Sequence, residues 1–312
     1  MNQFVWRLHR GQAFFAAGAF AAFATVLIIT GIHMANTYHG ALAICSTTSE
    51  CSGLNQLFNG DGFIIDLVNL SAALPLLLAL FWGTPLVAKE FEDGTQDLVW
   101  TQSVTRRKWM GTNIMWALLA AVALGGATSA FVSWWRGPEN ALFGRFSQFD
   151  IQGIVPIAYC VFAVALGIAA GAWLKRLLPA LAVTLGTFVV VRGAIGIFVR
   201  PHYLAPIRES FSLVVGKLTP PANAWFLSKD VIGPTGHIAN INSPSAIPPA
   251  CHGAVFNGSL LNCLSAHGYR SLIGFQPDSR YWAFQGIEAA IYLVLAAALV
   301  GFAYRRVLSR DA

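Results

Sequence analysis

Six long runs of apolar residues divide the chain, and mostly polar segments separate them. The runs cover residues 13–33, 63–88, 111–134, 153–173, 179–199 and 283–304. Each is close to the length of about 20 residues that an α-helix needs to cross a hydrocarbon core about 30 Å thick. A helix also satisfies its backbone hydrogen bonds internally, as hydrocarbon requires. The pattern therefore predicts six membrane-spanning helices.

The composition supports this fold class. Hydrophobic residues make up 56% of the chain and charged residues only 11%, whereas soluble domains carry about 25% charged residues. The net charge is +6, and the basic residues cluster beside the apolar runs. An anionic lipid surface explains that placement better than nucleic acid does. We expect an all-α integral membrane protein and exclude a soluble globular domain.

The distribution of Lys and Arg predicts the orientation, because short cytoplasmic loops are enriched in these residues. With both termini in the cytoplasm, the inner segments hold eleven basic residues, and the short outer segments hold two, Arg136 and Arg145. The last outer segment, 200–282, is too long to count in this rule. We expect a multi-pass protein of the cell membrane with cytoplasmic termini, a cytoplasmic segment at 89–110 and an extracytoplasmic loop at 200–282.

Two segments outside the apolar runs have amphipathic patterns. In residues 2–12, Phe4, Val5 and Leu8 share one helical face, which suits an interfacial helix lying on the inner membrane surface. An early start of the first span explains the same residues equally well. In the outer loop, residues 206–218 fit a short amphipathic helix.

The predicted topology sorts the five cysteines into two kinds. Cys45 and Cys51 lie in the first outer loop, and Cys251 and Cys263 lie in the last one. Because extracytoplasmic compartments are oxidising, we expect two local disulfides there. Cys160 lies alone in the fourth apolar run and fits a small core residue. The histidine spacing near the cysteines does not match a zinc site, so we expect no metal site.

The segment between the second and third runs has an unusual arrangement of charge. It reads PLVAKEFEDGTQDLVWTQSVTRRKW from residue 85 to 109, with Glu90, Glu92 and Asp93 preceding Gly94. Glycine permits a sharp turn, and Thr95 suits the N-cap of a short helix. A loop that only obeys the inside-positive rule explains the basic residues from Arg106 onward. It does not explain three acidic residues placed before Gly-Thr.

This segment resembles the corresponding part of ABC-2-type permeases, the membrane subunits of ATP-driven exporters. The family pattern has a Glu, an acidic or polar residue, Gly-Thr, a hydrophobic patch and a Ser/Thr-Arg pair. The matching positions are Glu90, Asp93, Gly94, Thr95, Leu98, Gln102, Ser103, Thr105 and Arg106. The six-span layout and the long outer loop before the last span also match, so the resemblance covers nearly the whole chain.

The resemblance implies a coupling segment that docks into a separate ATP-binding subunit. The residues to which it assigns this role are Glu90, Glu92, Asp93, Gly94, Thr95, Gln102 and Arg106. ATP and Mg would be bound by the partner, because this chain has no Walker pattern: Gly216-Lys217 is followed by Leu218. It further implies two ATP-binding subunits and a second permease, identical or related. We expect no enzyme activity and no bound cofactor in this chain itself.

Charged residues inside the apolar runs are expensive and face protein or water. Arg192 lies in the fifth run, with Asp66 and Glu288 as candidate ion-pair partners in the second and sixth. Snorkelling of Arg192 to the outer headgroups is an equally good interpretation. In the fourth run, Gly167 and Gly171 form a G-x-x-x-G motif, which indicates close helix packing.

Three functions remain in competition at this point. The leading hypothesis is the permease of an ATP-driven exporter with a lipophilic substrate. A membrane-embedded enzyme usually has paired catalytic side chains within its spans, and an ion-coupled carrier has carboxylates near the midplane. The runs contain only scattered charged groups, which ranks both alternatives lower.

Overall fold

The computed structural model describes residues 2–45, 62–93, 106–214, 223–241, 247–252 and 258–308. Within this part of the chain, six helical segments are long and apolar enough to cross a membrane. They are Ala17–Gly40, Ile64–Glu92, Arg107–Trp135, Val155–Leu174, Leu177–His202 and Asp278–Leu308. Each overlaps one of the apolar runs, so the prediction of a mostly helical membrane protein is confirmed.

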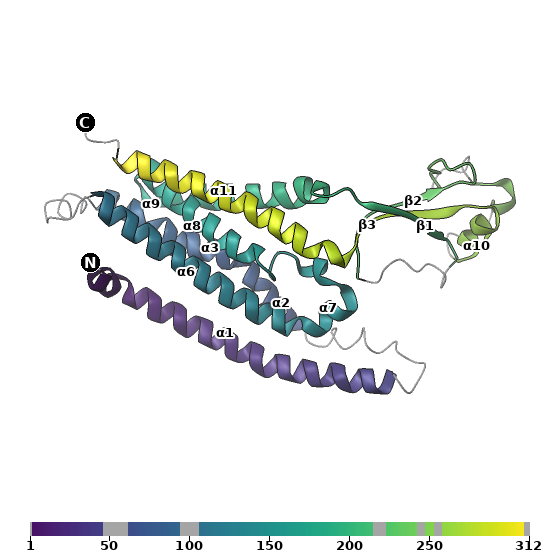
Figure 1. The fold of residues 1–312 in the computed structure, drawn as a ribbon, viewed down its shortest axis with the longest axis horizontal. Coiled ribbons are helices and arrows are strands. Elements are labelled where there is room, and N and C mark those ends of the chain that lie inside the picture. Colours follow the sequence, from purple (N-terminus) through teal and green to yellow (C-terminus); the bar gives the residue numbers. More distant parts are fainter. Residues whose placement is uncertain are drawn as a thin grey trace. The chain divides into compact units, whose positions relative to one another are not determined.

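The chain divides into two compact units. The first contains residues 1–138, 148–200 and 283–312, and the second contains residues 139–147 and 201–282. The helices of the first unit are α1 (Asn2–Cys45), α2 (Gly62–Leu70), α3 (Leu74–Leu78), α4 (Pro85–Glu92), α6 (Arg106–Trp135), α8 (Val155–Leu174), α9 (Leu177–Ala194) and most of α11 (Tyr281–Leu308). Figure 1 shows the long helices of this unit running alongside one another.

Helix α8 forms the centre of the first unit. In its most apolar window 83% of the residues are buried, against 17–33% in the other five spans. Small residues allow this burial, because they let neighbouring backbones approach closely. A Cβ atom added at Gly167 would lie 2.7 Å from the backbone nitrogen of Thr84, and one at Gly171 would lie 3.0 Å from that of Ala88. The G-x-x-x-G face of α8 therefore packs against the turn that precedes α4 and against the middle of α4.

The second crossing segment is irregular. A 3-10 turn, Ser71–Ala73, separates α2 from α3, and a π-helical turn, Ala79–Gly83, separates α3 from α4. Pro75 and Pro85 each lie in the first turn of a helix, where a missing N–H costs little. Neighbouring groups satisfy part of the interrupted backbone, as membrane helices require. The carbonyl oxygen of Ala72 in the 3-10 turn, for example, accepts a hydrogen bond of 2.8 Å from Arg192.

Helix α1 begins at Asn2 and continues without a break to Cys45. A separate interfacial helix at residues 2–12 is therefore not confirmed, and the geometry agrees with an early start of the first span. Trp135 at the end of α6 donates from Nε1 to the Thr30 hydroxyl on α1, at 3.0 Å.

The second unit contains a small antiparallel sheet, which the sequence analysis did not predict. Strands β1 (Ile207–Ser212), β2 (Trp225–Ile232) and β3 (Arg270–Gln276) are arranged in the order β1-β3-β2. The register pairs Ile207 with Phe275 and Trp225 with Gln276. The expected amphipathic helix at 206–218 is wrong for residues 207–212, because pairing with the distant strand β3 outweighs the local helical pattern.

Helices α7 (Gly137–Phe143) and α10 (Gly258–Ala266) are short. Residues 139–147 belong to the same unit as the sheet. In this unit Arg145 binds Asp278 through Nε at 3.0 Å and through a terminal nitrogen at 2.6 Å. In this unit Cys251 and Cys263 are joined as a disulfide that connects a 3-10 turn to α10. Leu213, Leu260 and Leu264 form a small core around it.

Candidate functional site

A network of hydrogen-bonded charges lies where α9 ends. Beyond Ala194 the helix widens into a π-helical turn, Ile195–Val199, and Arg200 follows directly. Its guanidinium binds Glu288 on α11 through two hydrogen bonds of 2.8 Å, one from Nε and one from a terminal nitrogen. The same terminal nitrogen donates to Asp150, which precedes α8. A bidentate arginine–carboxylate pair is a strong and geometrically specific contact.

The hydroxyl of Tyr159 on α8 joins the two carboxylates. It lies within hydrogen-bond distance of Asp150 Oδ1, at 2.9 Å, and of Glu288 Oε1. It also accepts a hydrogen bond of 3.1 Å from Arg200. A phenol has a single proton to donate, so Tyr159 serves one carboxylate at a time while Arg200 holds both. The network ties α8, α9, α11 and the segment before α8 together.

Burial makes this network energetically demanding. The side chain of Glu288 is 0% exposed and that of Arg200 11% exposed, whereas Asp150 retains 42%. A buried charge is tolerated only when it is paired and hydrogen-bonded. Burial alone would raise the pKa of Asp150, but the charge and hydrogen bond of Arg200, with smaller contributions from Arg192 and Tyr159, hold that pKa below its ordinary value. Asp150 is therefore an anion at neutral pH.

Arg192 lies on α9, eight residues before Arg200 in the same span, and it has different partners from those proposed. Its guanidinium donates to the carbonyl oxygen of Ala72 at 2.8 Å and stacks over the ring of Tyr159, 4.7 Å from the ring centre. The hypothesis that Arg192 pairs with Asp66 or Glu288 is therefore wrong.

Two local features explain the different pairing. The carboxylate of Glu288 is held by Arg200 through both oxygens, and Asp66 lies exposed on α2. The carbonyl of Ala72 belongs to the 3-10 turn Ser71–Ala73, where the altered helical hydrogen bonding leaves carbonyl groups available to other donors.

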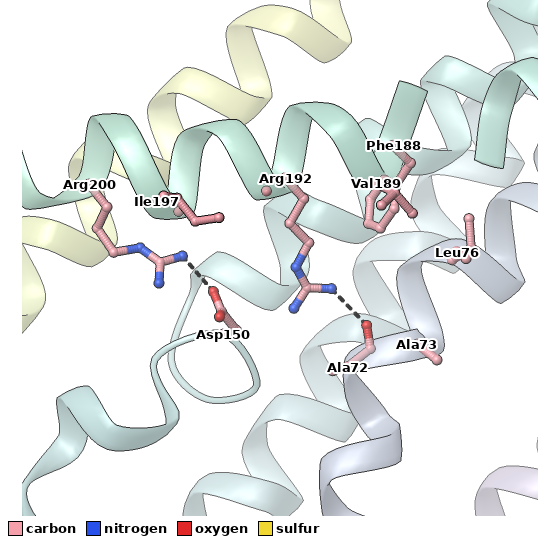
Figure 2. Close-up of a pocket in the computed structure, with 11 residues that line it drawn as sticks. Ala72, Ala73, Leu76, Asp150, Phe188, Val189, Arg192, Ile197 and Arg200 are labelled. Atoms are coloured by element: carbon pink, nitrogen blue, oxygen red, sulfur yellow. Dashed lines mark hydrogen bonds and ion pairs between the residues drawn. The ribbon is translucent and has the colours of Figure 1, made fainter. Parts of the chain in front are cut away.

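Arg192, Arg200 and Asp150 line a cavity of about 520 Å³ within the first unit. Figure 2 shows both arginines pointing to the same side of α9, with Asp150 beside Arg200 and Ala72 beside Arg192. Eight α-helical residues turn a side chain about 80° past two full turns. The wider π-helical turn takes up part of that rotation and so brings the two arginines to one face. The remaining wall is apolar and includes Leu76, Phe188 and Ile197.

The opposite end of α9 meets the end of α4. Helix α9 begins at Leu177 without a side-chain cap from Arg176, the residue that precedes it. Glu92, the last residue of α4, accepts a hydrogen bond from the backbone N–H of Leu177 at 2.8 Å. Lys175, in a left-handed conformation, places its ammonium over the ring of Phe91 at 5.1 Å. The acidic end of α4 is thus attached to the turn between α8 and α9.

The remaining predicted residues fall into three groups. Glu90, Glu92 and Asp93 lie at the end of α4, with Glu92 and Asp93 exposed. Gly94, Thr95, Gln102 and Cys51 lie outside the described residues, as do the side chains of Arg106 and Cys45. Gly167 and Gly171 lie at the close contact of α8 with α4.

Cys251, Cys263 and His267 bring their ligand atoms within 4.8 Å of one another. A metal ion would need thiolates, but here the two sulfurs are bonded to each other. The arrangement fits a disulfide rather than a metal centre.

Sequence reasoning missed Asp150, Tyr159 and Arg200. Arg200 was counted as part of a long loop, although it directly follows the fifth apolar run. A usable signal was present: the predicted topology puts the segment before the fourth run, the end of the fifth and the start of the sixth on one side of the membrane. Charged residues at those three places were candidates for one cluster.

Comparison with known proteins places this architecture in a family. No curated protein and no solved structure matches the chain. The family described as ABC-2 membrane transporter related matches residues 17–200, which is more than half of the chain and includes the ends of α4 and α9 described above. Six membrane-competent helices agree with a transmembrane subunit that works with an ATP-binding partner. The chain therefore belongs to the ABC-2 membrane transporter related family.

Proposed function

We propose that this chain is the permease subunit of an exporter that is driven by ATP hydrolysed on a separate subunit. The observation that carries the proposal is the attachment of α4 to α9. Because Glu92 binds the first N–H of α9, a force applied to the acidic end of α4 acts on the second and fifth spans together. Rigid-body movement of packed helices is a common way to transmit such a force.

The proposed coupling segment covers residues 89–110, with Glu90, Glu92 and Asp93 presented to the partner in the cytoplasm. In this proposal both termini are cytoplasmic and residues 200–282 are extracytoplasmic. Two permeases, identical or related, assemble with two ATP-binding subunits. The chain binds no nucleotide itself, and ATP and Mg belong to the partner.

A lipophilic substrate is part of the proposal. A second cavity, about 680 Å³ in volume, lies between α1 and the irregular second span and is lined almost entirely by apolar side chains. Phe20, Phe23, Leu74 and Trp82 are among them. An apolar lining favours lipophilic molecules, which can enter the cavity from the bilayer.

Charge reversal at the end of α4 tests the proposal. The tagged chain is purified with the ATP-binding protein that accompanies it, and ATP hydrolysis is measured after reconstitution. Glu90→Arg with Glu92→Arg should lower copurification and hydrolysis at least fivefold, because ion pairs to the partner would become repulsive. Glu209→Arg, an exposed change on β1, is the matched control and should change neither.

Two outcomes would contradict the proposal. One is normal ATP hydrolysis by the doubly reversed variant; the other is cysteine labelling that places residues 89–110 outside the cell. An ion-coupled carrier, the main alternative, would transport without a nucleotide and would stop when the proton or sodium gradient is collapsed. The described carboxylate best placed for ion coupling, Glu288, has both oxygens held by Arg200, which disfavours that mechanism.

A further inference from the structure

The cavity beside α9 contains a cation with unused donors. A guanidinium has five N–H groups, and Arg192 donates one hydrogen bond within the described residues, to the carbonyl of Ala72. No described carboxylate lies within ion-pair distance of it. The side chain is partly buried and lines the cavity. Its remaining donors suit an anionic group such as a phosphate or carboxylate.

The same cavity contains an anion with an unused acceptor. Both hydrogen bonds to Asp150, from Arg200 and from Tyr159, reach Oδ1. Its other oxygen, Oδ2, accepts none from the described residues, and the side chain is 42% exposed. The lowered pKa of Asp150 keeps this oxygen charged. It suits an ammonium group.

The charge balance selects between ligands of different charge. Arg192 and Arg200 carry two positive charges, and Asp150 and Glu288 carry two negative charges, so the cluster is neutral. An anion alone or a cation alone would leave one uncompensated charge beside the buried side chains of Arg200 and Glu288, which is costly. A ligand with one charge of each sign keeps the site neutral while using both free groups.

The shape of the cavity adds an apolar requirement. Leu76, Phe188, Val189 and Ile197 line it, and Val189 and Ile197 are 56% and 67% exposed on the outer surface of α9. In a span, that surface faces hydrocarbon. A polar group between Arg192 and Asp150 can therefore be continuous with an apolar tail that lies along α9.

We propose that this cavity binds a zwitterionic amphiphile, with its anionic group on Arg192, its ammonium on Asp150 and its tail along α9. The site is defined by these contacts and does not depend on whether the chain exports. The ligand is either a bilayer lipid or a transported molecule of the same chemistry.

Photocrosslinking tests the proposal on the full chain in maltoside micelles. Three probes carry the same diazirine-labelled tail: lysophosphatidylethanolamine, which is zwitterionic; lysophosphatidic acid, which is anionic; and a long-chain alkylamine, which is cationic. We expect the zwitterionic probe to label residues 188–197 most efficiently. Equal labelling by all three probes would overturn the inference, because hydrophobic partitioning alone would then explain it.

Substitution of the two charged groups should change the selectivity in opposite directions. Arg192→Gln should reduce labelling by the zwitterionic and anionic probes about tenfold and leave labelling by the alkylamine unchanged. Asp150→Asn should reduce labelling by the zwitterionic probe and raise the ratio of anionic to zwitterionic labelling. A general loss of folding cannot produce such opposite shifts. A change of less than twofold in Arg192→Gln, with Arg305→Gln as control, would refute the anionic half of the site.

Filling the cavity provides an independent test. A Cβ atom at Gly193 meets no atom within 4 Å, and Gly193 lines the cavity. Gly193→Trp should abolish labelling. Gly186, two turns earlier on α9, also has open space around it and does not line the cavity, so Gly186→Trp should label normally. Unchanged labelling of Gly193→Trp would overturn the proposal.

A final measurement identifies the source of the ligand. ATP hydrolysis by the complex with the partner is recorded with and without lysophosphatidylethanolamine. Stimulation that Gly193→Trp abolishes indicates a transported molecule. Labelling without stimulation indicates a resident lipid and leaves the binding site intact. Failure of ATP hydrolysis altogether bears on the proposed function and not on this site.

Discussion

Removal of the Arg200 charge is the most direct perturbation of the network at the end of α9. In Arg200→Met the apolar stem of the side chain is largely preserved, while two hydrogen bonds of 2.8 Å to Glu288, one to Asp150 and one to Tyr159 are lost. Glu288 is 0% exposed, so its carboxylate stays in place without a countercharge. Stranding one partner of a buried ion pair costs about 3–5 kcal/mol.

We expect a loss of about 3 kcal/mol, at the lower end of that range, because Arg200 is still 11% exposed and some water can reach the site. The free energy of unfolding is measured in mixed maltoside–SDS micelles by circular dichroism. Arg305→Met, on the exposed face of α11, is the matched control and should change stability by no more than about 0.5 kcal/mol.

The double variant Arg200→Met with Glu288→Met makes the reasoning refutable. It removes the stranded carboxylate, so it should be more stable than Arg200→Met alone even though it carries an additional substitution. If Arg200→Met has the same free energy of unfolding as the wild type, the ion pair contributes nothing to stability. If the stability loss of the double variant equals the sum of the losses of the two single variants, the two groups are not coupled.

Three further predictions concern other parts of the structure. The pKa of Asp150 is lowered in the folded state. Its charge therefore stabilises the fold above the unfolded pKa of about 3.9, and this stabilisation is lost as the pH falls through the folded pKa. The difference in free energy of unfolding between wild type and Asp150→Asn, measured from pH 7 to pH 3, should shrink only below about pH 4. Gly167→Ala should lower the free energy of unfolding by about 1–3 kcal/mol, because its Cβ would lie 2.7 Å from Thr84. Gly186→Ala, whose Cβ would meet open space, should be neutral or stabilising in the same unfolding assay. Equal effects of the two variants would contradict the packing argument. Maleimide should label Cys251 and Cys263 only after reduction, as read by mass spectrometry of their peptides, and labelling of either residue in the oxidised protein would contradict the disulfide.

The pairing of charges shows what the sequence left open. Arg192 was recognisable as an unusual residue, because a charge within an apolar run is expensive wherever the helices lie. Its partner was not recognisable, since that depends on the rotation of α9. The π-helical turn Ile195–Val199 changes this rotation, and no residue pattern in the run predicts such a turn. As a result Glu288 binds Arg200, and Arg192 binds a backbone carbonyl.

The second unit shows a different limit. Residues 207–212 have a helical amphipathic pattern but form strand β1, whose partner β3 lies more than 55 residues away in the chain. Local propensity is a weak signal for short segments, and pairing with a distant strand outweighs it. Continuity of α1 from Asn2 was one of two interpretations that the sequence supported equally.

The apolar runs by themselves determined that the chain is a helical membrane protein with six candidate spans, because hydrocarbon requires each spanning segment to satisfy its own backbone and to be about 20 residues long. The segment around Gly94, together with the six-span layout and the long outer loop, indicated the family. Only the tertiary structure decided that α8 is the buried helix, that Glu92 binds the start of α9, and that Asp150, Tyr159, Arg200 and Glu288 meet. Those contacts join residues from separate helices, and their rotation and depth are set by packing between helices rather than by the sequence of any one of them.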